Sequence, residues 1–124
     1  MLTPRRHVVS DAARLWLSAI VPPLLWATHF LLGYALAELG CKNLFAALQV
    51  GELSGTTILI VALTLITVVL MMWNGWSAAR AGTRAQPAAT YRAFLYALAV
   101  TESIVFGVTV FVTGLAAFGA TSCT

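Results

Sequence analysis

The chain has 124 residues, the length of a single domain, and carries a formal net charge of +3. Hydrophobic residues make up 60% of it and charged residues only 9%. A typical soluble domain has about 25% charged residues, so this composition excludes a water-soluble globular fold. The basic residues stand mainly at the ends of apolar runs, so they indicate membrane topology and not nucleic-acid binding.

Three apolar runs are long enough to cross a bilayer core of about 30 Å as helices, which takes about 20 residues each. We expect these spans at about residues 15–39, 55–79 and 93–119. Three segments cannot close a β-barrel, and backbone groups in lipid need hydrogen-bond partners within their own segment. The sequence therefore predicts an all-α integral membrane bundle of three transmembrane helices, forming one domain over residues 1–124.

The first run follows a basic leader and contains Ala35-Leu36-Ala37, which resembles a signal-peptide cleavage site. Its apolar stretch is longer than the ~7–15 residues of a signal-peptide core, so we expect an uncleaved anchor, with a cleaved signal peptide as the alternative. Pro22 and Pro23 have no N–H, which leaves the carbonyls of Ser18 and Ala19 without their usual donors. We expect a kink there, with Ser, Thr or water as the replacement donor.

Each span also has a face of small and polar residues, the kind of face through which membrane helices pack together. On the first span this face holds Ser18, Pro22, Trp26, His29, Gly33, Ala37 and Gly40. On the second and third it holds Thr57, Thr64, Thr67, Met71, Asn74 and Ala78, and Glu102, Ser103, Gly107, Thr113, Gly114 and Ala117. The three faces are expected to meet in one seam, and packing explains nearly all of these residues.

The distribution of basic residues predicts the orientation of the bundle. Arginines precede the first span and flank the loop between the second and third, namely Arg5, Arg6, Arg14, Arg80, Arg84 and Arg92. The loop at about residues 40–54 holds Lys42 against Glu52, and the tail 120–124 has no charged side chain. The positive-inside rule therefore predicts the N-terminus in the cytoplasm and the C-terminus outside, in a bacterial inner membrane.

His29 and Glu102 are ionisable residues within the depth of the predicted spans, where such groups are usually paired or functional. Both are expected to be neutral, and Glu102 is expected to donate a hydrogen bond to a carbonyl freed by the prolines or towards His29 through water. Counting from the flanking arginines puts the two residues ~7.5 Å apart in height, so a direct hydrogen bond is not favoured. Three roles stay open: a structural polar contact, a contact with a partner subunit, or a proton path, metal site or haem site. A single histidine is weak support for haem, so we predict no metal and no cofactor.

Cys41 and Cys123 follow the first and third spans and are both expected on the outer side, where disulfides form. We predict a bridge between them, with two free thiols or a copper site, which soft thiolates suit, as alternatives. Tyr34 and Glu38 share another face of the first span with Cys41. Together with Trp26 they are candidate partner contacts, although an interfacial helix end with a snorkelling acid is the simpler explanation.

The stretch from Pro22 to Phe30, followed by Tyr34, Glu38 and Cys41, resembles the first helix of a group of small bacterial inner-membrane proteins without an assigned activity. Members of that group are found beside cytochrome c oxidase and its assembly factors. The resemblance extends to the three-helix layout and a late cysteine. It implies an association with respiratory oxidases, with His29, Tyr34 and Cys41 at the matching positions.

These patterns favour a protein that is not an enzyme. The chain has no Gly-rich phosphate loop, no Ser-His-Asp set and no soluble domain. Our first hypothesis is an accessory or assembly component of a respiratory membrane complex, acting through helix contacts with lipid and with other membrane subunits such as a terminal oxidase. The alternatives are a small oligomeric transporter or proton-conducting subunit built around His29 and Glu102, and a haem- or copper-handling protein.

Overall fold

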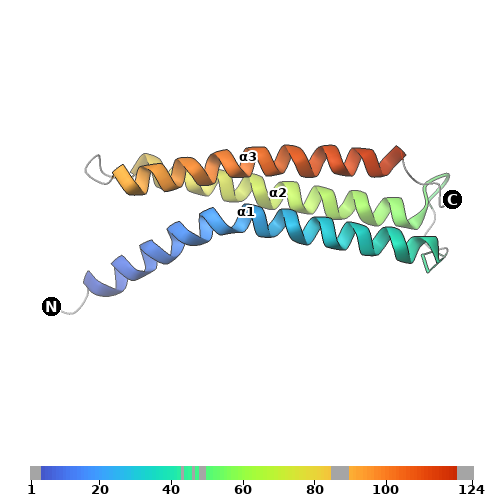
Figure 1. The fold of residues 1–124 in the computed structure, drawn as a ribbon, viewed down its shortest axis with the longest axis horizontal. Coiled ribbons are helices and arrows are strands. Elements are labelled where there is room, and N and C mark those ends of the chain that lie inside the picture. The colour runs from blue at the N-terminus through green and yellow to red at the C-terminus, as the bar shows by residue number, and fades with distance from the viewer. Residues whose placement is uncertain (1–3, 43, 46, 48–49, 85–89, 120–124) are drawn as a thin grey trace.

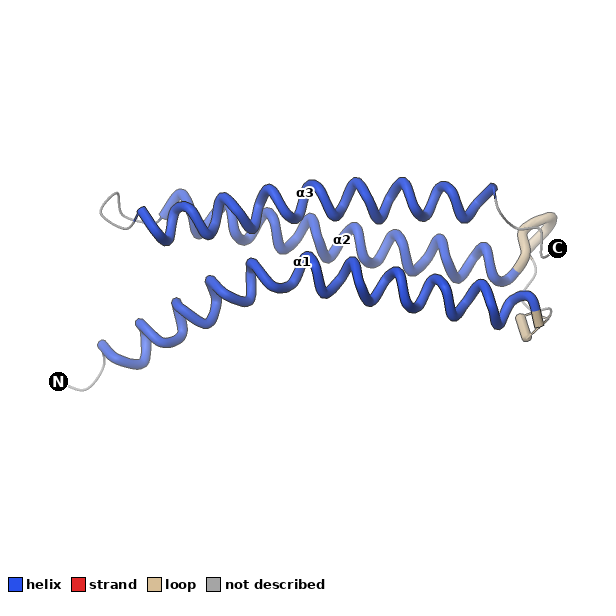
Figure 2. Tube along the Cα trace, viewed as in Figure 1, coloured by secondary structure: helices blue, strands red, loops and turns tan. Residues whose placement is uncertain are grey.

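The computed structural model consists of three long helices lying side by side (Figure 1). Helix α1 comprises Pro4–Cys41, α2 comprises Gly55–Arg84 and α3 comprises Thr90–Gly119. The structure describes the whole chain except residues 1–3, 43, 46, 48–49, 85–89 and 120–124. Within the described part, Figure 2 shows helices and loops and no strand, so the all-helical prediction is confirmed.

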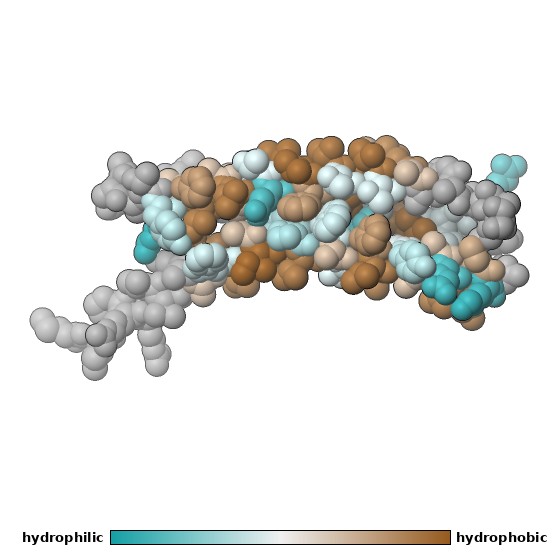
Figure 3. Space-filling model, viewed as in Figure 1, coloured by the Kyte–Doolittle hydropathy of each residue, from teal (hydrophilic) through white to brown (hydrophobic). Residues whose placement is uncertain are grey.

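Each helix contains a segment long and apolar enough to cross a membrane. These segments are Ala13–Cys41, Gly55–Gly82 and Tyr91–Ala116, and they overlap the three predicted spans. Figure 3 shows apolar side chains over most of the visible face, with hydrophilic ones gathered at the end where α1 passes into its loop. The helices themselves run beyond the apolar segments, because helical hydrogen bonding continues where the sequence turns polar.

Small residues let α2 and α3 approach closely along their length. A Cβ added at Gly75 would lie 3.1 Å from Ser103 Cβ, and one added at Gly114 would lie 2.5 Å from Thr64 Cγ2. The threonine face predicted for the second span is buried at Thr57, Thr64 and Thr67. That packing face is therefore confirmed.

The packing face predicted for the outer half of the first span is partly wrong. A Cβ added at Gly33 would meet nothing within 4 Å, and Ala37 is exposed. Gly40, by contrast, lies against the Thr56 side chain, which leaves no room for a Cβ. Thr113 on α3 is also exposed, with its hydroxyl donating to the Thr109 carbonyl of its own helix. Small residues therefore mark helix contacts at some levels and outward-facing surface at others.

Helix α1 is bent, as its two internal prolines predict. Figure 1 shows its N-terminal part diverging from α2 and α3, whereas the rest of the helix lies along them. Pro22 is fully buried, so the bend is packed against the other helices and does not face outward. The Ser18 carbonyl, which Pro22 deprives of its donor, lies where α2 can reach it.

Candidate functional site

Asn74 on α2 joins all three helices at the level of the bend. Its Nδ2 donates to the Ser18 carbonyl at 3.0 Å and to Ser103 Oγ on α3 at 3.2 Å. The Ser18 carbonyl is the group that Pro22 leaves without its intrahelical donor, so an amide from a neighbouring helix replaces the lost bond. The structure confirms that this oxygen finds a partner, but the donor is Asn74 and not the Ser, Thr or water that the sequence suggested.

His29 is 4% exposed and connects α1 to α2. Its Nε2 lies 3.0 Å from Thr64 Oγ1, and the Thr64 hydroxyl donates to the Ile60 carbonyl at 2.8 Å. The Thr64 hydroxyl therefore lies between the imidazole and a backbone carbonyl, and the imidazole tautomer decides which atom donates in the contact with Nε2. In this geometry the contact links α1 to α2.

Glu102 on α3 has no such contact. Its side chain is partly exposed, and its Oε2 is buried without a hydrogen-bond partner in the described chain. Among the described residues, Glu102 does not form the expected bond to a carbonyl freed by the prolines, and the donor to the Ser18 carbonyl is Asn74. Within the same part of the chain, no hydrogen bond joins Glu102 to His29. This agrees with the sequence analysis, which did not favour a direct bond.

The heights of these two residues follow from an aromatic contact between the parallel helices α1 and α3. The rings of Trp26 and Phe106 have centroids 5.8 Å apart. Glu102 precedes Phe106 by one turn, and Pro22 precedes Trp26 by one turn, so Glu102 lies at the level of the bend in α1. His29 then lies about seven residues further along, or ~10 Å of helix rise, which separates it from Glu102.

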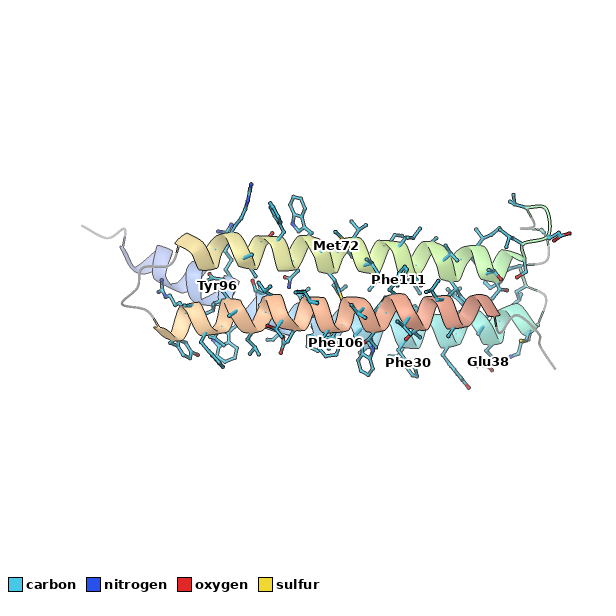
Figure 4. The ribbon with its side chains drawn as sticks, turned by 90° about the horizontal axis from the view of Figure 1, so that it is seen from above. Phe30, Glu38, Met72, Tyr96, Phe106 and Phe111 are labelled. Carbon is cyan, nitrogen blue, oxygen red and sulfur yellow. The ribbon has the colours of Figure 1, made fainter. Side chains whose placement is uncertain are left out.

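The candidate partner-contact residues on α1 differ in whether they already contact another helix of the bundle. Trp26 stacks on Phe30 at 6.2 Å as well as meeting Phe106, and it remains 38% exposed. Tyr34 is 68% exposed, and Glu38 forms an exposed pair with Lys42 at 3.7 Å. Figure 4 shows Phe30 and Glu38 along the outer edge of the bundle. Trp26 thus belongs to the α1–α3 contact, whereas Tyr34 and Glu38 lie on free surface.

Cys41 takes part in a disulfide. Its predicted partner, Cys123, lies outside the described residues, so the pairing stays a prediction. Within the part of the chain that the structure describes, no group of three or more His, Cys, Asp or Glu is placed to hold a metal. The ionisable residues singled out from the sequence lie at different heights along the bundle and do not form one cluster in the described chain.

Sequence reasoning assigned Asn74 and Thr64 to packing faces but missed their hydrogen bonds. The hydrogen bond of Asn74 could have been predicted, because Asn74 is an amide within an apolar span, and Pro22 leaves a carbonyl in another span without its donor. That of Thr64 could not, since any of several threonines on the same face was an equally good hydrogen-bond partner for His29.

Comparison of the chain with protein-family models, curated proteins and solved structures found no match.

Proposed function

We propose that the chain is an accessory or assembly component of a larger membrane complex and acts through helix contacts. Its three apolar helices cross a bacterial inner membrane, with the N-terminus in the cytoplasm and the C-terminus outside. The observation that carries the proposal is Glu102, whose Oε2 is buried within the bundle and lacks a partner among the described residues. The other buried polar side chains of the seam, such as His29 and Asn74, are satisfied within the chain.

An unsatisfied polar group at hydrocarbon depth costs several kcal/mol, so membrane proteins pair such groups or place them on a functional path. Glu102 is partly exposed although Oε2 itself is buried, so a change of rotamer brings the carboxyl within reach of a helix packed against α1 and α3. A partner helix that offers a hydrogen-bond donor or acceptor at this level removes the penalty only in the assembled complex. A respiratory oxidase is the partner class we propose, because of the resemblance of Pro22–Phe30, Tyr34 and Cys41 to proteins found beside such enzymes.

The test compares Glu102→Leu with Glu102→Gln, both as isolated protein and in native membranes. In the isolated bundle, Glu102→Leu removes no internal hydrogen bond, so its free energy of unfolding should stay within about 0.5 kcal/mol of wild type or rise. In native membranes it should reduce co-purification of oxidase subunits, measured by quantitative mass spectrometry, while Glu102→Gln retains them. Thr101→Val is the matched control, because Thr101 is exposed on the adjacent position and donates only to Ala97 of its own helix.

Two results would contradict this reasoning. One is a loss of stability above ~1 kcal/mol in isolated Glu102→Leu with unchanged co-purification, which would make Glu102 an internal structural residue. The other is a well-folded, fully assembled Glu102→Gln protein without function, since an amide cannot exchange a proton at neutral pH. That second result would favour the proton-conducting alternative.

A further inference from the structure

The loop that joins α1 to α2 carries large apolar side chains on its surface. It lies at the right of Figure 2, drawn in tan where it is described, and its Leu44, Val50 and Leu53 are 63%, 69% and 43% exposed. Its charged residues are Lys42 and Glu52. An exposed apolar patch with a polar rim is typical of a surface that contacts a membrane or another protein. This part of the loop is therefore a candidate contact surface.

Residues 50–53 form a tight hairpin turn that puts two of these side chains on one side. The Val50 N–H donates to the Leu53 carbonyl at 3.3 Å, and the Leu53 N–H donates to the Val50 carbonyl at 3.2 Å, so the two residues face each other as an antiparallel pair. The side chains of such a pair point to the same side. Gly51, with a φ of 63°, supplies the left-handed backbone that the first central residue of a two-residue turn requires. Val50 and Leu53 therefore form one apolar edge.

The two ends of α2 give the height of this edge relative to a membrane. Gly40 lies against the Thr56 side chain, so α1 and α2 meet the loop at the same height. Towards the other end of α2, Trp76 is exposed, and an exposed tryptophan prefers the membrane interface. From Trp76 back to Thr56 is ~30 Å of helix rise, which is the thickness of a hydrocarbon core. Leu53 precedes Thr56 by three residues, so it lies ~5–10 Å beyond that core, at the height of the lipid headgroups.

A membrane surface fits the edge better than a protein partner does. A stable protein interface buries about 800 Å² on each side, far more than three aliphatic side chains offer. A backbone that leaves water also needs its polar groups paired. The turn meets this condition, because the amide and carbonyl groups of Val50 and Leu53 bond to each other. Glu52, at the tip of the turn, is exposed, so its carboxylate can stay hydrated.

We propose that Leu44, Val50 and Leu53 insert into the headgroup region of the membrane at this end of the bundle and hold the loop on the membrane surface. In the orientation proposed above, this surface belongs to the outer leaflet. The inference rests on the membrane insertion proposed above and is independent of any partner complex, because Glu102 lies at the level of the bend in α1, whereas the loop follows the far end of that helix.

The test is the reactivity of single cysteines towards a membrane-impermeant maleimide. The chain is reconstituted in vesicles of phosphatidylcholine alone. Cys41 and Cys123 are replaced by serine in every variant, so that the effect of their loss cancels in each ratio of rates. Val50→Cys should react about tenfold more slowly than Glu52→Cys, because a thiol among lipid headgroups is shielded from the reagent and its thiolate is disfavoured away from water. The chain itself gives no such protection, since both positions are exposed.

Two further variants separate this proposal from the insertion on which it rests. Val69 lies within the apolar segment of α2 and is 62% exposed in the chain, so Val69→Cys is protected in these vesicles only if the segment is inserted. A protected Val69→Cys beside a freely reacting Val50→Cys would leave the insertion intact and overturn the loop contact alone. Leu53→Cys is a second reporter of the same edge and should be protected to the same degree as Val50→Cys.

Equal rates for Val50→Cys and Glu52→Cys in the vesicles would overturn the proposal. Protection of Val50→Cys in native membranes but not in phosphatidylcholine vesicles would also overturn it, because the edge would then contact a protein and not lipid. A freely reacting Val69→Cys would show that the chain is not inserted, and would overturn the proposed topology together with the loop contact.

Discussion

Replacing Asn74 by leucine should destabilise the bundle by about 2 kcal/mol. The change keeps the side-chain volume nearly constant but removes the amide that bonds Ser18 and Ser103. Interhelical hydrogen bonds in membrane proteins average ~0.6 kcal/mol, which accounts for ~1 kcal/mol over the two bonds. The remainder comes from the Ser18 carbonyl, which has no intrahelical donor opposite Pro22, because a buried acceptor left unpaired costs ~1–3 kcal/mol.

A double-mutant cycle with Pro22→Ala isolates this carbonyl. Alanine restores the N–H that a regular helix directs at the Ser18 oxygen, so Asn74→Leu should cost less in the Pro22→Ala background than in wild type. We expect a coupling of about 1 kcal/mol, which is above the ~0.5 kcal/mol by which independent sites depart from additivity. Pro22 is fully buried, and the cycle subtracts the packing loss caused by its replacement.

The assay is equilibrium unfolding of the purified chain in mixed micelles of mild detergent and dodecyl sulfate, followed by circular dichroism. Thr101→Val serves as the control, since its exposed hydroxyl donates only to Ala97 of the same helix. A cost of Asn74→Leu below ~0.5 kcal/mol, or an equal cost with and without Pro22, would refute the assignment of Asn74 to the freed carbonyl.

The remaining predictions concern the buried imidazole, the orientation and the cysteines. Thr64→Val keeps the side-chain shape and removes the hydroxyl that forms the hydrogen bond with His29 Nε2, so it should cost ~0.6–1.7 kcal/mol in the same unfolding assay; no change would mean that the contact is not stabilising. A reporter active only outside the cytoplasm should work after Thr124 and be silent within residues 81–90, and the reverse pattern would overturn the orientation. Unreduced, denatured protein should take up no thiol label, and reduction should expose Cys41 and Cys123, whereas two labelled thiols without reductant would exclude the bridge.

The number of helices and the positions of their apolar segments could be predicted from the sequence, because both follow from the lengths of the apolar runs, whereas the polar start of α1 at Pro4 lies outside any such run. The contacts between helices could be predicted only in part. In a membrane, the surface facing lipid and the surface facing another helix are equally apolar, so hydrophobicity does not define the rotation of a helix about its axis. Gly33 and Gly40 illustrate this, since both are small residues on the predicted face of the first span, but only Gly40 meets another helix.

Hydrogen-bond partners were harder still to predict, because they depend on the relative heights of the helices to within one residue or two. Counting from flanking arginines placed Glu102 nearer to His29 than the Trp26–Phe106 contact does. An error of two residues is ~3 Å of rise, which is enough to exchange one hydrogen-bond partner for another. The bend at Pro22 adds to this, since residues on its two sides approach the other helices at different angles.

The position of Asn74 on the middle helix has consequences for biogenesis. Chains are synthesised from the N-terminus, so α1 is complete before α2 and α3 exist. Until α2 is made, the Ser18 carbonyl has a donor neither in its own helix nor in a neighbouring one, and until α3 follows, the second hydrogen of the Asn74 amide lacks its acceptor on Ser103. With the membrane insertion proposed above, a nascent chain that stops early therefore keeps an unsatisfied polar group at hydrocarbon depth. The same amide distinguishes a finished bundle from an unfinished one.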